Sequence, residues 1–452
     1  MPGKTASDIL KLLSASNAQK VKLAVTDIDG VLRGKVISIE KFTSIIEKGF
    51  GFCDVIFGWD SGDVAYDNSA ITGWHTGYPD ANAVVDLNTF RTVPWQNDMP
   101  FFLADFCDTD GNDLPVCPRR LLKKIVKQAE HEGYLPYFSQ EFEWFNLIDN
   151  RNENKFTDLK PLTSGMFGYS ILRASQQSKY FNDLFDLLKK FGIPLEGLHT
   201  ETGPGVYEAA ILYSETAEAA DRAVLFKTGV KEIAYMHGIL PTFMAKFSDT
   251  LPGCSGHVHQ SLWSKDAKQN LFFDKNSDTH ISPLMESYIA GQLFCMPHIL
   301  AMYAPTVNSY KRLVEGAWAP TTLTWAIDNR TTALRALPAG DMSTRLETRV
   351  VGSDANPYLA MAGCLASGLY GIKNKLKLET PATKGSGYND KGNGVLPKNL
   401  WEATQNMKQS NLAKELFGQN FSDHFVATRE WEWKQFSKTV TDWELKRYLE
   451  II

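Results

Sequence analysis

The chain lacks a surplus of positive charge, closely paired cysteines and a secretion signal. Its 452 residues contain 47 Lys and Arg against 52 Asp and Glu, which gives a net charge of −5. Without a basic surplus there is no reason to expect nucleic acid or an anionic membrane as a partner. We therefore expect no nucleic-acid partner, and any anionic ligand must be held by arginines placed locally.

The six cysteines are spread along the chain without a Cys-x-x-Cys pair. This spacing favours buried, reduced thiols over a disulfide framework or a zinc site. The N-terminal segment has no apolar stretch before a small-residue cleavage site. Together these features predict a cytoplasmic protein.

Long hydrophobic segments are also scarce. Residues 287–305 are almost uncharged and approach the roughly 20 residues that a membrane span needs. Gln292, Pro297 and His298 interrupt this segment, and no second one resembles it. We expect a helix buried in a large core, and no membrane partner.

Two regions with different patterns follow one another. Residues 21–40 alternate apolar and polar side chains around Asp29-Gly30, which predicts a β-hairpin. The segment TDIDG also resembles the signature of phosphatases with an aspartate nucleophile, but the pattern after it predicts a returning strand rather than a helix. Short strand-like segments continue to about Phe106. We predict a first domain of mostly antiparallel sheet over residues 18–111.

From Pro118 onward helical spacing dominates. Helices are predicted over 118–132, 172–191 and 215–237, with a strand over 141–148. Residues 384–395 are rich in Gly, Lys and Asn and predict a surface loop rather than a domain boundary. The second domain is therefore predicted over residues 112–452.

Acidic side chains and histidines recur in pairs. Glu141 and Glu143 are two residues apart in a strand-like run, so both point to one face, where they repel unless a cation lies between them. Glu201 and Glu208 bracket the glycine-rich ETGPGVYE, and His257 shares a strand face with His259. Taken singly, the first pair also fits a solvated strand face, the second an ordinary loop, and the histidine pair polar packing. Together they suggest Mg²⁺ or Mn²⁺, which prefer oxygen ligands, Mn²⁺ also accepting imidazole.

Arginines accompany these carboxylates. In the segment RLETR, Arg345, Glu347 and Arg349 alternate onto one face, and Arg312, Arg330 and Arg335 lie in nearby motifs. Arginine suits bidentate recognition of carboxylate and phosphate. In an acidic chain this set suggests an anionic substrate and a nucleotide polyphosphate.

In this order, the segments TDIDGVLRGK, EFEWF, ETGPGVYEAAILY, FMAKFSDTLPGCSGHVHQSLW, NSYKRLVEG, DNRTTALRAL and RLETRVVGSDANPYLAMA resemble the glutamine synthetase superfamily over essentially the whole chain. The resemblance implies an α+β fold, with an N-terminal β-grasp domain and a catalytic α/β domain built on a curved antiparallel sheet. It implies a dodecamer of two stacked hexameric rings. It also implies that ATP phosphorylates the γ-carboxylate of glutamate and that an amine then displaces phosphate.

Roles carried over by resemblance cover the whole predicted site. Two or three Mg²⁺ or Mn²⁺ ions per site would be held by Glu143, Glu201 and Glu208 and by Glu141, His257 and Glu347. The nucleotide would contact Tyr213, His259, Ser261, Arg330 and Arg335, of which the two arginines would stabilise the transferring phosphoryl group. Glutamate would contact Gly253, Arg312 and Arg349. Glu201 is also a candidate for deprotonating the amine.

The sequence departs from the family where ammonium would bind. Trp318 replaces a flap glutamate and Met166 replaces a tyrosine, whereas Asp60 and Asp63 are alternatives for an aspartate that enters the neighbouring site. Ammonium needs polar partners to replace its water, while an organic amine gains from apolar contact, by about 0.8 kcal/mol per buried CH₂. We predict a glutamate–amine ligase that makes a γ-glutamyl amide from a small organic amine.

Three alternatives stay open at this point. Glu315 could take over the lost glutamate's role, which would make the protein an ordinary glutamine synthetase using ammonia. The chain could be a non-catalytic structural member of the superfamily, although such a member has no reason to keep crowded carboxylates. A metal-dependent phosphohydrolase would need a residue that activates water, and the sequence offers no candidate.

Overall fold

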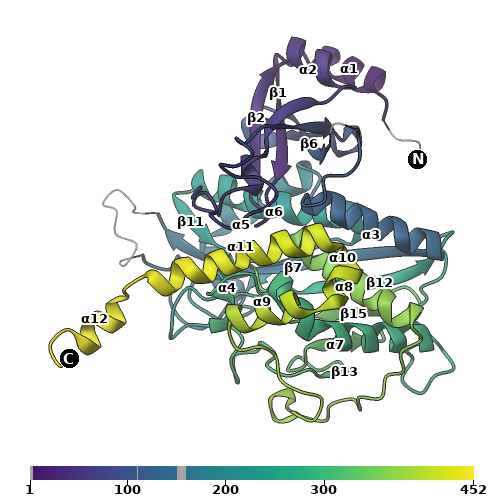
Figure 1. Cartoon of the computed structure of the whole chain (residues 1–452), viewed down its shortest axis with the longest axis vertical. Helices are drawn as coiled ribbons and strands as arrows, with labels where there is room; N and C mark the ends of the chain where they lie inside the picture. Colours follow the sequence, from purple (N-terminus) through teal and green to yellow (C-terminus); the bar gives the residue numbers. More distant parts are fainter. Residues whose placement is uncertain (1–3, 109, 150–158) are drawn as a thin grey trace.

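A computed structural model of the chain describes residues 4–108, 110–149 and 159–452. Within these residues the strands form two separate sheets, a smaller one near the N-terminus and a larger one in the main body (Figure 1). No helix of the described part is long and apolar enough to cross a membrane. The architecture is mixed α+β, as the sequence predicts.

The N-terminal sheet contains six strands in the described residues, in the order β2-β1-β6-β4-β3, with β5 also paired to β6. The strands are β1 (Lys20–Thr26), β2 (Leu32–Ser38), β3 (Phe50–Cys53), β4 (Asp80–Val85), β5 (Arg91–Val93) and β6 (Met99–Cys107). The predicted hairpin is confirmed, because β1 and β2 pair antiparallel from Lys20–Ser38 to Thr26–Leu32. The carboxylate of Asp27 accepts the backbone N–H groups of Asp29 and Val31, so it shapes the turn.

Two helices pack on this sheet, α1 (Ala6–Ala15) and α2 (Ile39–Ile45). Ile9 and Leu13 of α1 join Phe42 of α2 and Phe102 of β6 in a cluster of buried side chains. The helix α1 precedes the predicted range of 18–111. The domain boundaries themselves stay predictions.

The larger sheet is curled and contains nine strands in the described part of the chain. Its main path is β13-β14-β15-β12-β7-β9-β8, and β10 and β11 also pair with β7. The strands are β7 (Tyr134–Ile148), β8 (Leu195–Thr200), β9 (Val206–Ile211), β10 (Ser214–Glu215), β11 (Ile239–Thr242), β12 (Val258–Ser264), β13 (Trp325–Ile327), β14 (Leu334–Leu337) and β15 (Arg345–Thr348). The strand predicted over 141–148 is therefore the second half of a longer one.

Helices cover this sheet (Figure 1). They are α3 (Pro118–Glu132), α4 (Ile171–Gln176), α5 (Ser178–Lys190), α6 (Thr216–Tyr235), α7 (Pro283–Tyr303), α8 (Pro357–Lys373), α9 (Leu400–Gln409), α10 (Asn411–Phe417) and α11 (Gln419–Lys438). The last helix, α12 (Asp442–Tyr448), projects away from the sheet at the C-terminal end (Figure 1). The helix predicted over 172–191 is divided into α4 and α5, because the backbone of Gln177 leaves the helical region at φ −114° and ψ 31°.

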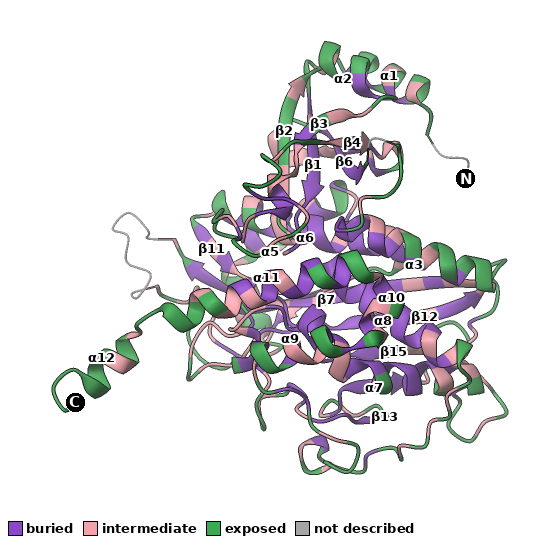
Figure 2. Cartoon of the chain, in the orientation of Figure 1, coloured by how far each residue is buried: buried purple, intermediate pink, exposed green. Residues whose placement is uncertain are grey.

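The core lies between the large sheet and its helices (Figure 2). Phe142 and Trp144 of β7 contact Phe226 of α6 and Phe243 through stacked and edge-to-face rings. The uncharged segment predicted to be a buried helix is α7, and most of its side chains are buried. All six cysteines are free, five of them buried, as predicted.

Buried ion pairs join the N-terminal sheet to the main body. Arg119 of α3 contacts Asp86 and Asp105 on one side and Asp221 of α6 on the other, at 2.7–2.8 Å. Arg429 of α11 contacts Asp29 in the hairpin turn at 2.6 Å. These pairs fix the N-terminal sheet against the large sheet and its helices.

Candidate active site

One face of the curled sheet carries the predicted acidic residues in register. Glu143 of β7 lies opposite Glu208 of β9, which in turn lies opposite His199 of β8. Because side chains opposite one another in a sheet share a face, these three point the same way. Glu141 is two residues before Glu143, so it joins them, as the sequence predicts.

A second row of side chains crosses the neighbouring strands. Arg335 of β14 lies opposite Glu347 of β15, and Glu347 lies opposite His259 of β12. The guanidinium of Arg335 donates to Glu347 at 2.9 Å. His259 Nε2 is 3.6 Å from Glu141 Oε2, which connects the second row to the first.

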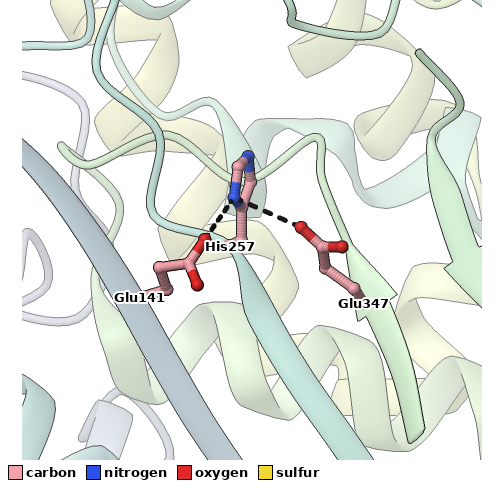
Figure 3. A group of neighbouring side chains, drawn as sticks. All are labelled: Glu141, His257 and Glu347. Atoms are coloured by element: carbon pink, nitrogen blue, oxygen red, sulfur yellow. Dashed lines mark hydrogen bonds and ion pairs between the residues drawn. The ribbon is translucent and has the colours of Figure 1, made fainter. Parts of the chain in front are cut away.

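His257 lies between the two rows (Figure 3). Its Nδ1 atom is 3.0 Å from Glu141 Oε1 and 3.3 Å from Glu347 Oε1. The side chain is buried, and its Nε2 atom has no hydrogen-bond partner among the described residues. A buried polar atom without a partner is costly, so it indicates a group that the protein binds at this point.

The pKa values of two carboxyl groups on this face are shifted in opposite directions. Burial raises the pKa of Glu208 far above its ordinary value, and the neighbouring Glu141, Glu143 and Glu201 raise it further. For Glu347 burial acts in the same direction, but Arg349, His257 and His259 outweigh it and lower its pKa to about 2. Carboxylates crowded in this way need a cation before all of them can ionise.

Three overlapping groups of side chains could hold metal ions. Their members are Glu141, His257 and Glu347; Glu143, Glu208 and His257; and His199, Glu201 and Glu208. In each group one ligand atom per residue lies within 4.8 Å of the others. Carboxylate oxygens with an imidazole suit a divalent cation, and the orphaned Nε2 of His257 fits such an ion.

His199 was missed by the sequence analysis. Its Nε2 atom is 3.5 Å from Glu208, and its Nδ1 atom is 4.0 Å from Glu201. The signal that could have found it is the spacing His199-x-Glu201, which places both side chains on one strand face.

The predicted glutamate-binding residues lie beside this cluster. Arg349 donates to Glu347, and its Nε atom donates to the Arg330 carbonyl at 3.0 Å. Arg312 is buried, and its guanidinium donates to the carbonyls of Val350 and Arg349 and to Ser255 Oγ. The guanidinium of Arg312 therefore donates three hydrogen bonds to other groups of the protein.

Gly253 packs directly against Arg312. A Cβ atom at Gly253 would lie 2.7 Å from both the Ala245 carbonyl oxygen and the Arg312 Cγ atom. Such contacts leave no room for a side chain. The backbone therefore approaches the arginine closely at this point.

A cavity of about 290 Å³ opens beside the carboxylates and collects three of the predicted nucleotide-binding residues. Tyr213, His259 and Ser261 all line it, together with Glu141 and Arg345. At one end the rings of Tyr137, Tyr213 and Trp263 form an aromatic group with centroids 5.9–6.1 Å apart. Arg330 and Arg335 are not part of this lining, and Arg330 is exposed.

The two residues that depart from the family pattern are both exposed. Trp318 is 64% exposed and Met166 is 51% exposed. The carboxylate of Glu315 is paired with Lys391 at 3.2 Å. Glu315 therefore has a partner at the protein surface.

Tyr388 was also missed, because its segment predicted only a surface loop. Gly387 accepts a hydrogen bond from Thr322 and donates one to Thr331, both at 2.8 Å, so the loop is anchored here. Burial raises the pKa of Tyr388, while the backbone of Trp318 and the charges of Arg349 and Arg312 oppose this. Arg349 and Arg312, which are predicted to contact glutamate, are thus part of the electrostatic surroundings of this phenol.

Asp60 and Asp63 differ in how they are held. Asp60 accepts two backbone N–H groups, from Gly62 and Val64, and the indole N–H of Trp431 at 2.9 Å. Asp63 is paired with Arg33 at 2.7 Å, and its side chain is about half exposed. Asp63 is thus the more accessible of the two carboxylates.

Comparisons with known proteins agree with this geometry. A family model described as the catalytic domain of glutamine synthetase matches residues 115–448. A relative from Dictyostelium discoideum, type-1 glutamine synthetase 2, is 53% identical over 98% of this chain and 86% of its own length. Glutamate–isopropylamine ligase from Pseudomonas sp. is 37% identical over the full length of both chains. A solved structure of GmaS in complex with ADP superposes with a TM-score of 0.84 at 26% identity, covering 98% of this chain and 99% of the other.

The fold, the acidic cluster and these relatives define a ligase that forms carbon–nitrogen bonds with ATP. The chain belongs to the glutamine synthetase family. Members of this family join glutamate to ammonia or to an amine, and they use ATP and divalent metal ions.

Proposed function

We propose that the protein phosphorylates the γ-carboxylate of glutamate with ATP and transfers the γ-glutamyl group to a small organic amine. The products are a γ-glutamyl amide, ADP and phosphate. The observation that carries the proposal is that Trp318 and Met166, which by resemblance take the places of two polar residues of the ammonium pocket, are apolar and exposed. An alkyl group gains free energy from such contacts, whereas NH₄⁺ loses water there without replacement.

Glu315 is a poor substitute for the missing flap glutamate. Its carboxylate is paired with Lys391 in the loop that also carries Tyr388. Its side chain is 60% exposed in this position, so ammonium held by it would stay in contact with solvent. This supports an organic amine over ammonia.

ATP would occupy the cavity beside the carboxylates. The aromatic group formed by Tyr137, Tyr213 and Trp263 suits a purine ring. Ser261 lies at this aromatic end, where its hydroxyl accepts the indole N–H of Trp263, whereas His259 lies beside Glu141, where phosphates would meet the carboxylates. Arg330 and Arg335 would stabilise the charge on the transferring phosphoryl group. Phosphoryl transfer depends mainly on this kind of positioning and charge placement.

Two or three Mg²⁺ or Mn²⁺ ions would be held by two sets of residues. Glu141, His257 and Glu347 form one set, and they lie together in the structure. By resemblance the other set is Glu143, Glu201 and Glu208, and the structure places Glu208 close to Glu143 in one group and to Glu201 in another. Bound divalent ions would neutralise the phosphate charge and the crowded carboxylates. His199 would join Glu201 and Glu208 in the second set.

Glutamate would be positioned by Gly253, Arg312 and Arg349. The γ-carboxylate oxygen attacks the terminal phosphorus of ATP, and ADP leaves. The amine nitrogen then attacks the γ-carbon, the bond to the phosphate oxygen breaks, and phosphate leaves. Glu201, at the rim of the carboxylate cluster, is the proposed acceptor of the amine proton.

The experiment is phosphate release from ATP with Mg²⁺ and glutamate, in which ammonium is compared with methylamine, isopropylamine, ethanolamine, polyamines and aniline. We expect fast turnover with one organic amine and little with ammonium. Faster turnover with ammonium would overturn the proposal. If neither ATP nor metal bound, a non-catalytic role would take its place.

Glutamine synthesis from ammonia is the second candidate. The 53% identity to a protein named type-1 glutamine synthetase 2 favours it. The panel above separates the two candidates directly. Resemblance to the family also supports a cytoplasmic location and a dodecamer of two stacked hexameric rings. Light scattering after size exclusion measures the molar mass and so tests the number of subunits.

A further inference from the structure

The turn over residues 165–170 places a large aromatic side chain at the edge of the acidic cluster. Tyr169 has a φ of 55°, in the left-handed region that a bulky residue rarely adopts. Its backbone N–H donates to the Thr200 carbonyl at 2.6 Å, and the Ser170 N–H donates to Thr200 Oγ1 at 2.8 Å. The two hydrogen bonds therefore attach the turn to the end of β8. The strained backbone of Tyr169 lies beside the functional residues.

The ring of Tyr169 stacks on His199. Their centroids are 4.5 Å apart and the two planes differ by 29°. His199 in turn is 3.5 Å from Glu208 and 4.0 Å from Glu201. Tyr169, which is 69% exposed, is thus linked through His199 to the buried carboxylate of Glu208 and the partly buried one of Glu201.

The electrostatic surroundings of the phenol agree with this position. Burial raises the pKa of the Tyr169 hydroxyl, Glu201 and Glu208 raise it further, and Arg330 acts in the opposite direction. The position of Tyr169 itself follows from the stacking of its ring on His199, which lies beside Glu208 and Glu201.

We propose that Tyr169 is a specificity-determining residue that forms one wall of the acceptor-amine pocket, and that the pocket takes a primary alkylamine. This inference rests on the proposed function and adds a residue to it. Met166 comes from the same turn, so the turn supplies both an aromatic and a thioether surface. A protonated amine approaching Glu201 is attracted by the ring face, and its alkyl group gains from contact with the ring.

The position of Tyr169 also explains how the site works without a tyrosine at residue 166. The chain supplies a phenol three residues later, on a turn that is fixed to β8.

The test uses the full-length protein and steady-state kinetics with methylamine, isopropylamine, ethanolamine and ammonium. We expect Tyr169→Ala to raise the KM for the preferred alkylamine by about 2- to 30-fold. The KM values for ATP and glutamate should stay within about twofold of wild type, which a general structural lesion would not allow. Tyr169→Leu keeps apolar bulk and Tyr169→Phe keeps the ring, so these two variants separate contact with the ring from contact with the hydroxyl.

Tyr235→Ala is the matched control, because Tyr235 is 73% exposed at the end of α6. It should change none of the KM values. An unchanged amine KM in Tyr169→Ala, or in Tyr169→Leu if the alanine variant does not fold, would overturn the inference. A parallel rise in all three KM values would also overturn it.

Failure of the proposed function gives a different result. If wild-type protein prefers ammonium, the organic-amine proposal is wrong, and the role of Tyr169 is then judged on the KM for ammonium. A rise in that value with Tyr169→Ala would still place the ring in the acceptor pocket. An unchanged KM for ammonium would show that the ring is not part of the acceptor pocket.

Discussion

Glu143 and Glu208 lie directly opposite each other on neighbouring strands, on the face of the sheet that carries the predicted site. Carboxylates placed opposite one another destabilise a sheet unless a cation or a proton separates them. Burial and three neighbouring glutamates raise the pKa of Glu208, so without metal this carboxyl keeps its proton at neutral pH. The opposed carboxylates therefore lower the stability of the metal-free protein, and they also provide a site that binds a cation.

Metal removal should therefore have a specific effect on stability. We expect Mg²⁺ at about a hundred times its Kd to stabilise wild-type protein by about 2–3 kcal/mol, seen as a rise in Tm after EDTA treatment and readdition. Glu208→Gln should lose most of this rise, yet be at least as stable as wild type without metal, because it removes a crowded carboxyl. Glu130→Gln, on the exposed side of α3, should behave like wild type. A metal-dependent rise of the same size in Glu208→Gln would contradict this account.

Much of this site follows from local sequence patterns. The two-residue spacing of Glu141 and Glu143 is enough to place both on one face of a strand, and the structure confirms it. The opposition of Glu143 and Glu208 is not local, because it depends on how β7 and β9 are paired. A shift of one residue in that pairing would turn Glu208 away from the site.

The residues that were missed have a similar explanation. Tyr388 lies in a loop whose composition predicts only exposure, whereas in the structure Thr322 and Thr331 anchor the neighbouring Gly387. Tyr169 is exposed and on a turn, so no periodicity marks it. The break between α4 and α5 at Gln177 depends on one backbone conformation, which spacing of apolar residues does not reveal.

The aromatic end of the cavity gives a second prediction. Tyr213→Ala removes the exposed ring that lies 6.1 Å from Tyr137, and with it a stacking surface for a purine. We expect the KM for ATP to rise about tenfold, with the KM for glutamate unchanged. Tyr213→Phe should keep the wild-type KM for ATP. Equal values for wild type and Tyr213→Ala would place the base elsewhere.

The third prediction is for Arg119, and it concerns the stability of the fold rather than catalysis. Its guanidinium is buried among Asp86, Asp105 and Asp221, which come from both sides of the contact between the N-terminal sheet and the main body. Arg119→Met leaves buried Asp221 without a counterion, whereas Asp86 and Asp105 keep Lys123, so we expect a loss of about 3–5 kcal/mol in the free energy of unfolding. Lys408→Met, which removes a surface pair with Glu430, should cost less than about 1 kcal/mol. Similar losses in urea-unfolding experiments on the two variants would argue against a structural role for the buried cluster.

His424 in α11 gives the protein a defined response to acid. The side chain is buried, and neither ring nitrogen has a hydrogen-bond partner in the described residues. Burial, with the charge of Arg429 adding to it, lowers the pKa of His424 to about 4. In an unfolded chain the pKa is about 6.5, so the unfolded state binds this proton first as the pH falls.

The contribution of neutral His424 to stability is therefore complete above about pH 6.5 and is lost progressively as the pH falls toward 4. From pH 7.5 to pH 5 this amounts to about 2 kcal/mol. His424→Leu keeps the apolar contacts of α11 and cannot be protonated, so its free energy of unfolding should fall less over this range than that of wild type. Urea unfolding at several pH values measures the difference. If the two proteins lost stability in parallel, protonation of His424 would have no part in acid unfolding.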